Sequence, residues 1–228
     1  MRPDSVMLFA AGFGTRMGAL TADRPKPMIE VAGKPLLDHA LELVEAIQPA
    51  RTVVNVHYLP DAIRTHLAGR DIAISDESDR ILETGGGLRK ALPLLGNGPV
   101  FTMNTDAVWA GPNPLQQLLH AWNPDQMDAL LLCIPLENAV GHTGQGDFVA
   151  DSENRLTRGP GQVYSGLQIL KPDLLAEIPE DAFSLNLLWN RMLAQRRLFG
   201  LSYPGQWCDV GRPEGIALAE RMIGYTHV

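Results

Sequence analysis

The chain has 228 residues, of which 45% are hydrophobic and 20% charged, so it can bury one substantial core, and no Pro-, Gly- or Ser-rich linker divides it. We therefore expect a single domain over residues 1–228. A net charge of −7, the absence of a signal-peptide pattern and the absence of a long apolar run together favour a cytoplasmic protein with no nucleic-acid or membrane partner.

The first part of the chain alternates apolar runs typical of buried strands with segments of helical periodicity. The strands are expected at residues 5–10, 52–56, 72–75, 99–103 and 129–134. The helices are expected at residues 35–47, 61–67, 86–95 and 115–122, the last of them capped by Asn113 and Pro114. This alternation predicts an α/β fold with a mostly parallel, Rossmann-like doubly wound sheet.

The later part of the chain is less regular. It predicts strands at residues 162–170 and 198–203, a helix capped by Ser184 that runs to about residue 196, and a final helix from Pro213 to about residue 225. The turn-rich region between residues 140 and 161 is expected to be an excursion that faces substrate. Cys133 and Cys208 lack metal-ligand spacing and are expected to be reduced thiols.

A glycine-rich turn follows the first predicted strand. Gly12 and Gly14 allow the backbone to approach a phosphate, and the positive charges of Arg16 and Lys26 follow. Met17 stands where a dinucleotide-binding fingerprint needs glycine, and the P-loop pattern also fails. Taken alone, the motif favours the alternative of a tight turn beside solvated cations, because glycine turns after strands are common.

The string Leu8-Phe-Ala-Ala-Gly-Phe-Gly-Thr-Arg-Met17, followed by Pro25-Lys26-Pro27, closely resembles the signature of sugar-1-phosphate nucleotidyltransferases. This resemblance implies the nucleotide-diphospho-sugar transferase fold, with a nucleoside triphosphate and a sugar 1-phosphate as substrates. It implies catalytic roles for Arg16 and Lys26. The nucleotide-binding residues that it implies are Ala11, Gly12, Gly14, Thr15, Arg16, Glu83, Thr84, Gly85 and Gly86.

Joining two anionic substrates calls for a divalent cation, and Mg²⁺ prefers carboxylate ligands. Asp106 follows a predicted strand and resembles the strand-end aspartate of the family, although Thr105 stands where glycine is usual. Asp209, in Trp207-Cys-Asp-Val-Gly211, resembles the second metal-binding carboxylate. The alternatives are a turn or capping residue for Asp106 and an Asx-turn for Asp209.

Three glycines at residues 85–87 open a predicted helix and allow a base or ribose to approach the backbone, with a flexible turn as the alternative. The Gly144–Phe148 string points to the sugar side, although Asp147 is also a common turn residue. The expected sugar-binding residues are Asn104, Gly146, Asp147, Tyr164, Ser165 and Gly166.

With the short chain, the strings at residues 83–87 and 144–148 look most like the N-acetylmuramate-1-phosphate uridylyltransferase branch of the family, which uses UTP in peptidoglycan recycling. The alternatives are a mannose-1-phosphate guanylyltransferase and a non-catalytic nucleotide- or sugar-binding regulator. The sequence predicts no oligomeric state.

Overall fold

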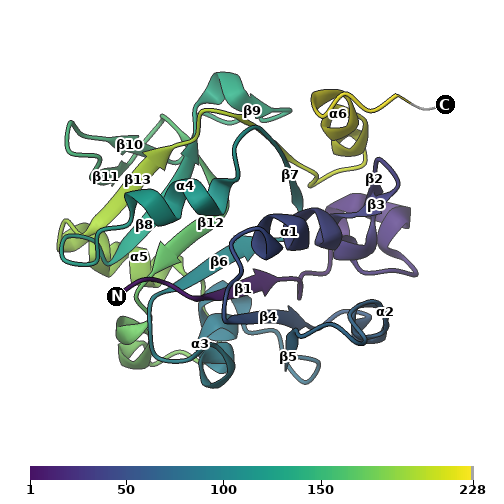
Figure 1. Cartoon of the computed structure of the whole chain (residues 1–228), viewed down its shortest axis with the longest axis horizontal. Coiled ribbons are helices and arrows are strands. Elements are labelled where there is room, and N and C mark those ends of the chain that lie inside the picture. The colour runs from purple at the N-terminus through teal and green to yellow at the C-terminus, as the bar shows by residue number, and fades with distance from the viewer. Residues whose placement is uncertain (227–228) are drawn as a thin grey trace.

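The computed structural model describes residues 1–226 and is built around a seven-stranded sheet (Figure 1). Strand β12 runs antiparallel to both of its neighbours, and every other adjacent pair in this sheet is parallel. The predicted α/β class and mostly parallel sheet are confirmed. In spatial order the strands are Leu198–Ser202 (β13), Ala129–Ile134 (β8), Val163–Leu170 (β12), Val100–Asn104 (β6), Ser5–Phe9 (β1), Arg51–Val56 (β4) and Ala73–Asp76 (β5).

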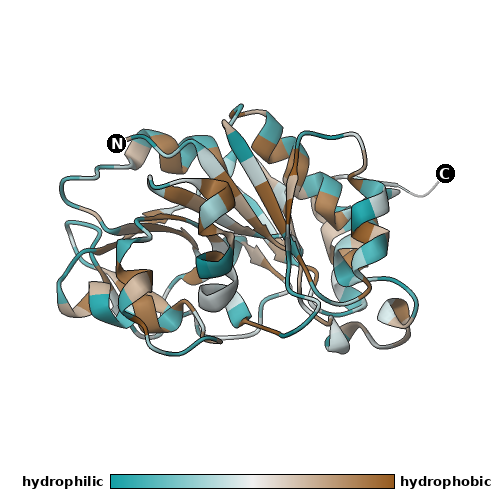
Figure 2. Ribbon diagram, turned by 90° about the horizontal axis from the view of Figure 1, so that it is seen from below, coloured by the Kyte–Doolittle hydropathy of each residue, from teal (hydrophilic) through white to brown (hydrophobic). Residues whose placement is uncertain are grey.

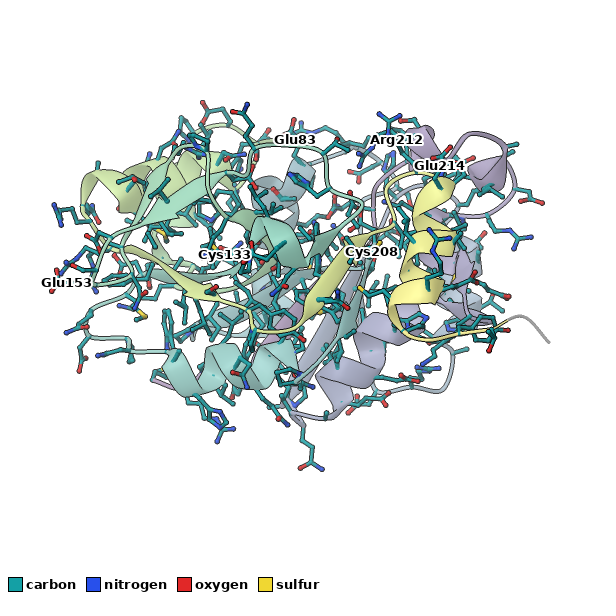
Figure 3. All side chains as sticks on the ribbon, turned by 90° about the horizontal axis from the view of Figure 1, so that it is seen from above. Glu83, Cys133, Glu153, Cys208, Arg212 and Glu214 are labelled. Carbon is teal, nitrogen blue, oxygen red and sulfur yellow. The ribbon has the colours of Figure 1, made fainter. Side chains whose placement is uncertain are left out.

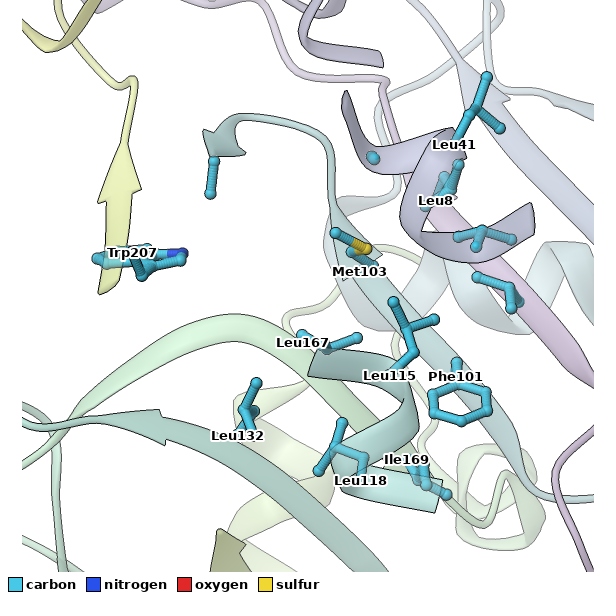
Figure 4. Close-up of a cluster of buried hydrophobic side chains, with 14 of the residues drawn as sticks. Leu8, Leu41, Phe101, Met103, Leu115, Leu118, Leu132, Leu167, Ile169 and Trp207 are labelled. Carbon is cyan, nitrogen blue, oxygen red and sulfur yellow. The ribbon is translucent and has the colours of Figure 1, made fainter. Parts of the chain in front are cut away.

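Helices cover both faces of this sheet because its strands are apolar on both sides. One face packs against Leu36–Glu45 (α1), Pro60–His66 (α2) and Pro114–Ala121 (α4). The other packs against Glu83–Leu95 (α3), Asn186–Ala194 (α5) and the 3₁₀ helix Asp173–Glu177 (η4). The hydropathy colouring shows apolar strands between helices of mixed character (Figure 2), and a close-up shows the first of the two hydrophobic clusters (Figure 4).

A smaller three-stranded sheet adjoins the central one. It consists of Ala107–Ala110 (β7), Gln206–Asp209 (β14) and Ala139–Val140 (β9), and Glu214–Met222 (α6) packs beside it. A third hydrophobic cluster joins α6 and β14 to Glu30–Val31 (β2), which pairs with Lys34–Pro35 (β3). The three-stranded sheet of β7, β14 and β9 was not expected from the sequence, because its strands are short and pair across large separations in the chain.

Most predicted elements are present within a few residues of their expected bounds. The Asn113 cap is confirmed, since its side-chain oxygen accepts hydrogen bonds from the N–H groups of Leu115 and Gln116. Helix α5 begins two residues after Ser184, whose hydroxyl accepts from the N–H of Asn186 instead of occupying the capping position. The predicted excursion contains a hairpin of Phe148–Ala150 (β10) and Leu156–Arg158 (β11). Two short 3₁₀ helices are Lys26–Met28 (η2) and Leu136–Asn138 (η3).

Both cysteines are buried free thiols in the interior of the molecule (Figure 3). Burial raises the pKa of Cys133 to about 12 and that of Cys208 to about 11. Neither thiol is ionised near neutral pH, so neither is an effective nucleophile there. Within residues 1–226, no helix combines the length and the apolar character needed to cross a membrane.

Candidate functional site

The candidate site lies beyond the carboxyl ends of β1, β4 and β6, where ligands bind in open parallel sheets. A cavity of about 330 Å³ opens there, lined by the loop after β1 and by the residues that follow β6. From the expected nucleotide loop, Ala11 and Gly12 line this cavity together with Phe13. Thr15 begins a kinked 3₁₀ helix, Thr15–Thr21 (η1), so the loop leads into this short turn rather than an α-helix.

Lys26 and Asp106 form the charged pair of this cavity. The Lys26 Nζ atom lies 2.6 Å from Asp106 Oδ2, and Lys26 is only 8% exposed. Gly14, with a φ of +64°, lies directly under Lys26, because a Cβ there would come within 2.8 Å of the lysine Cβ. The glycine turn therefore positions Lys26.

Asp209 lies next to Asp106 because β14 pairs antiparallel with β7. The N–H of Val210 donates to the Asp106 carbonyl over 2.8 Å. Burial raises the pKa of Asp209, and the negative charge of Asp106 raises it further. The Arg16 guanidinium lies near the Asp209 carboxylate, because both are close to Gly211. A Cβ on Gly211 would lie 2.8 Å from Asp209 Oδ2 and 3.1 Å from Arg16 Nη2.

Arg16 and Asp209 line a second cavity of about 270 Å³, to which Arg212 and Glu214 also contribute. Figure 3 shows these last two residues where α6 begins. The structure thus separates the two expected catalytic cations. Lys26 lines the first cavity and Arg16 the second, with the two aspartates between them.

Two carboxylates brought together, one of them with a raised pKa, are a suitable donor pair for a hard divalent cation. No group of three or more His, Cys, Asp or Glu side chains that could hold a metal occurs in residues 1–226. A magnesium ion held by Asp106 and Asp209 would take its other ligands from phosphate oxygens and water.

Thr105 occupies the position where the family signature has glycine. Its side chain is buried, and its hydroxyl donates to the Phe9 carbonyl over 2.8 Å. Thr105 is not among the residues with positive φ. The side chain thus joins the ends of β1 and β6 rather than straining the backbone before Asp106.

Asn55 and Glu77 belong to the first cavity and were not predicted from the sequence. Asn55 accepts from the Ala10 N–H over 2.7 Å and donates to Glu77 Oε1 over 2.8 Å. Burial raises the pKa of Glu77. Buried polar residues at the ends of two neighbouring strands were the available signal.

The glycines at the start of α3 serve packing within the chain. Gly85 and Gly86 are buried and donate their N–H groups to the carbonyl of Phe183. A Cβ at Gly85 would meet the Phe183 ring at 2.3 Å, so this glycine allows the close approach of a side chain of the protein itself. Of the expected residues on this helix, Glu83 and Thr84 line the cavity, and Glu83 has a φ of +57°.

A third cavity, of about 290 Å³, adjoins the first and shares Phe9, Thr84 and Asn104 with it. Three of the expected sugar-binding residues, Asn104, Asp147 and Tyr164, line it. Asp147 Oδ2 accepts from the Tyr164 N–H over 2.8 Å, which fixes the carboxylate at the cavity wall.

The other expected sugar-side residues support this wall from behind. Ser165 is 2% exposed and its hydroxyl donates to the Leu132 carbonyl, so it lies inside the sheet and away from the cavity. Gly146 packs against the Gly161 carbonyl, and Gly166 packs against Asn104. Ser165, Gly146 and Gly166 do not line this cavity.

A family model described as the MobA-like NTP transferase domain matches residues 6–146. The chain is 40% identical, over 97% of both chains, to an N-acetylmuramate alpha-1-phosphate uridylyltransferase from Caulobacter vibrioides. It is 32% identical to a protein of the same name from Neisseria meningitidis, over 96% of this chain and 97% of that one. A probable mannose-1-phosphate guanylyltransferase 1 from Oryza sativa is 25% identical over 95% of this chain, which spans 63% of that relative.

Solved structures of low sequence identity share the fold. HddC from Yersinia pseudotuberculosis superposes with a TM-score of 0.78 at 21% identity, over 97% of this chain and 99% of that one. An inositol-1-phosphate CTP transferase from T. maritima gives a TM-score of 0.78 at 14% identity, over 100% and 99% of the two chains. The expected nucleotide-diphospho-sugar transferase fold is confirmed.

Proposed function

The chain belongs to the family of MobA-like NTP transferases, and from this premise we propose that it transfers the uridylyl group of UTP to N-acetylmuramate 1-phosphate. As a sugar-1-phosphate nucleotidyltransferase it makes a nucleotide sugar and pyrophosphate. The choice of substrates is supported by full-length similarity to two relatives of that name, at 40% and 32% identity. The guanylyltransferase relative is more distant and extends beyond this chain.

One structural observation carries the proposal for the reaction itself. Two adjoining cavities meet at Asn104, and the Lys26–Asp106 pair lies in the first of them. Two substrates bound in adjoining cavities can bring a phosphate oxygen and an α-phosphorus into line, which lowers the entropic cost of the reaction. We place the nucleotide in the first cavity and the sugar in the third.

In this proposal the sugar phosphate oxygen forms a bond to the α-phosphorus while the bond to the β-phosphate oxygen breaks. Lys26 stabilises the charge that develops on the α-phosphoryl oxygens, because its ammonium is desolvated and fixed. Arg16, in the neighbouring cavity, binds the departing pyrophosphate. When bound by Asp106 and Asp209, Mg²⁺ supplies further charge neutralisation.

The residues around the cavity position these groups. Asn55 fixes the Ala10 N–H at the start of the nucleotide loop, and Glu77 fixes Asn55 in turn. Glu83 and Thr84 border the nucleotide from α3, and Thr84 also borders the sugar. Since peptidoglycan recycling and UTP are both cytoplasmic, we place the enzyme in that compartment.

The direct test is pyrophosphate release with Mg²⁺ across UTP, GTP, dTTP and CTP, each with N-acetylmuramate, N-acetylglucosamine, mannose and glucose 1-phosphates. We expect the largest kcat/KM with UTP and N-acetylmuramate 1-phosphate, and a large loss in Asp106→Asn. A preference for GTP with mannose 1-phosphate would identify a guanylyltransferase. Triphosphate binding without pyrophosphate release from any pair would identify a non-catalytic binder.

A further inference from the structure

Arg158 is the last residue of β11 and lines the third cavity, in which we place the sugar and which we call the sugar-side cavity. The sequence did not point to this residue. Its Nη2 atom donates to Asn186 Oδ1 over 2.8 Å and to Asn190 Oδ1 over 3.1 Å. The guanidinium carbon also lies 5.3 Å from the centre of the Phe148 ring. Two amides and an aromatic ring thus hold this guanidinium in one place.

None of these partners neutralises the charge of Arg158. Across residues 1–226 no carboxylate lies within salt-bridge distance of its guanidinium. Asp147, which lines the same cavity, is instead bonded to the Tyr164 N–H. Arg155, three residues earlier, is paired with Glu153, which Figure 3 shows at the outer edge of the molecule. Arg158 therefore keeps N–H donors for an anion that enters the cavity.

The phosphate of the sugar substrate is poorly placed to be that anion. It must reach the α-phosphorus beside Lys26 and Asp106. These two residues line the first cavity, in which we place the nucleotide and which we call the nucleotide cavity, and do not line the sugar-side cavity. Arg158 borders only the sugar-side cavity. An anionic group at a second position of the sugar would fit it.

N-acetylmuramate 1-phosphate carries such a group, because the lactyl ether on its O3 ends in a carboxylate. We propose that Arg158 binds this lactyl carboxylate and so selects the muramyl substrate. The inference rests on the proposed function and adds to it a residue that determines specificity for the sugar. N-acetylglucosamine 1-phosphate lacks the lactyl group and gains nothing from the guanidinium, whose fork geometry matches a carboxylate.

The test compares Arg158→Gln with the control Arg155→Gln, which alters the same hairpin at an arginine that also lies over a phenylalanine ring. Initial rates at saturating UTP and Mg²⁺ are measured with N-acetylmuramate 1-phosphate, with its carboxyl-amidated derivative and with N-acetylglucosamine 1-phosphate. In Arg158→Gln we expect the KM for N-acetylmuramate 1-phosphate to rise about tenfold and kcat to change little, as for loss of a charge-assisted hydrogen bond at an exposed site.

The discrimination between the acid and its amide should fall by about the same factor in Arg158→Gln and should persist in Arg155→Gln. Equal losses with all three sugars would overturn the inference and show that Arg158 only supports the cavity. Calorimetric binding of the same sugar phosphates separates this question from the proposed function. If the wild type turns over none of them, the proposed function fails. A binding preference for the acid that Arg158→Gln abolishes would still support the inference, and its absence would refute it.

Discussion

Lys26 combines burial, a carboxylate partner and a place in the nucleotide cavity. Replacing it by methionine keeps most of the volume and removes the charge. We expect Lys26→Met to lower kcat by roughly 100- to 1,000-fold, the usual cost of losing one preorganised donor at a developing charge. Steady-state pyrophosphate release measures this.

The control is Lys34→Met, which removes a lysine paired with Glu42 at the surface. Exposed salt bridges contribute little to folding stability, and Lys34 does not line the nucleotide cavity. Both kcat and the melting temperature should therefore stay near their wild-type values. A Lys26→Met enzyme that is folded and retains wild-type kcat would exclude the role assigned to this residue.

Ionisation of Asp209 costs folding free energy, because burial and the nearby charge of Asp106 raise its pKa. The pKa of Asp209 is higher in the folded than in the unfolded protein. Its ionisation therefore destabilises the fold at a pH above the folded-state pKa, and this cost vanishes at a pH below the unfolded-state pKa. In EDTA at pH 7.5, Asp209→Asn should melt about 2–4 °C higher than the wild type, the shift that a change on the order of 1 kcal/mol gives a domain of this size.

This stabilisation should shrink as the pH falls through the raised pKa toward the ordinary aspartate range, while the loss of Mg²⁺-dependent activity persists. Differential scanning calorimetry from pH 7.5 to 4 measures the trend. An Asp209→Asn protein less stable than the wild type at every pH would mean that the carboxylate supports the fold.

At the scale of the element, two glycines that look alike in the sequence have opposite surroundings. A Cβ at Gly86, in α3, would come 2.4 Å from the Asp181 carbonyl oxygen, whereas a Cβ at Gly12 would meet nothing within 4 Å. We expect Gly86→Ala to destabilise the protein by about 1–3 kcal/mol, since a buried overpacked site must shift its backbone. Gly12→Ala should retain stability and weaken triphosphate binding, because its methyl projects where the nucleotide is placed.

Urea unfolding and equilibrium binding of the triphosphate separate the two effects. A Gly86→Ala protein of normal stability with impaired nucleotide binding would restore the expected contact between α3 and the base. A Gly12→Ala protein that binds normally would move the nucleotide away from this loop.

The sequence predicted the features that local patterns encode and missed the contacts between segments that are far apart in the chain. Strands such as β1 and β8 and the Asn113 cap are encoded by local patterns, and the strings around Gly12 and Lys26 indicated the family. The pairing of β7 with β14 joins segments about a hundred residues apart, so the proximity of Asp106 and Asp209 depended on the resemblance alone. A run of glycines signals close approach but not which atoms approach, and at Gly85 they belong to Phe183.

At the scale of the whole molecule, the two large hydrophobic clusters lie on opposite faces of the same strands. In β8, Leu131 belongs to one cluster and Leu132 to the other, and neither side chain is exposed. Loss of packing on either face therefore removes support from a strand that both faces share. This continuity supports the proposal that residues 1–228 form a single cooperative domain, of which residues 227–228 lie outside the described part.

Leu131→Ala and Leu132→Ala test this cooperativity from the two faces. Each should destabilise the protein by about 2–5 kcal/mol, the range for a leucine truncated in a packed core. In urea, tryptophan fluorescence and far-UV circular dichroism should follow one transition in the wild type and shift together in each variant. Trp189 and Trp207 report on different clusters, so a variant whose fluorescence midpoint separated from its circular-dichroism midpoint would show that the two faces unfold independently.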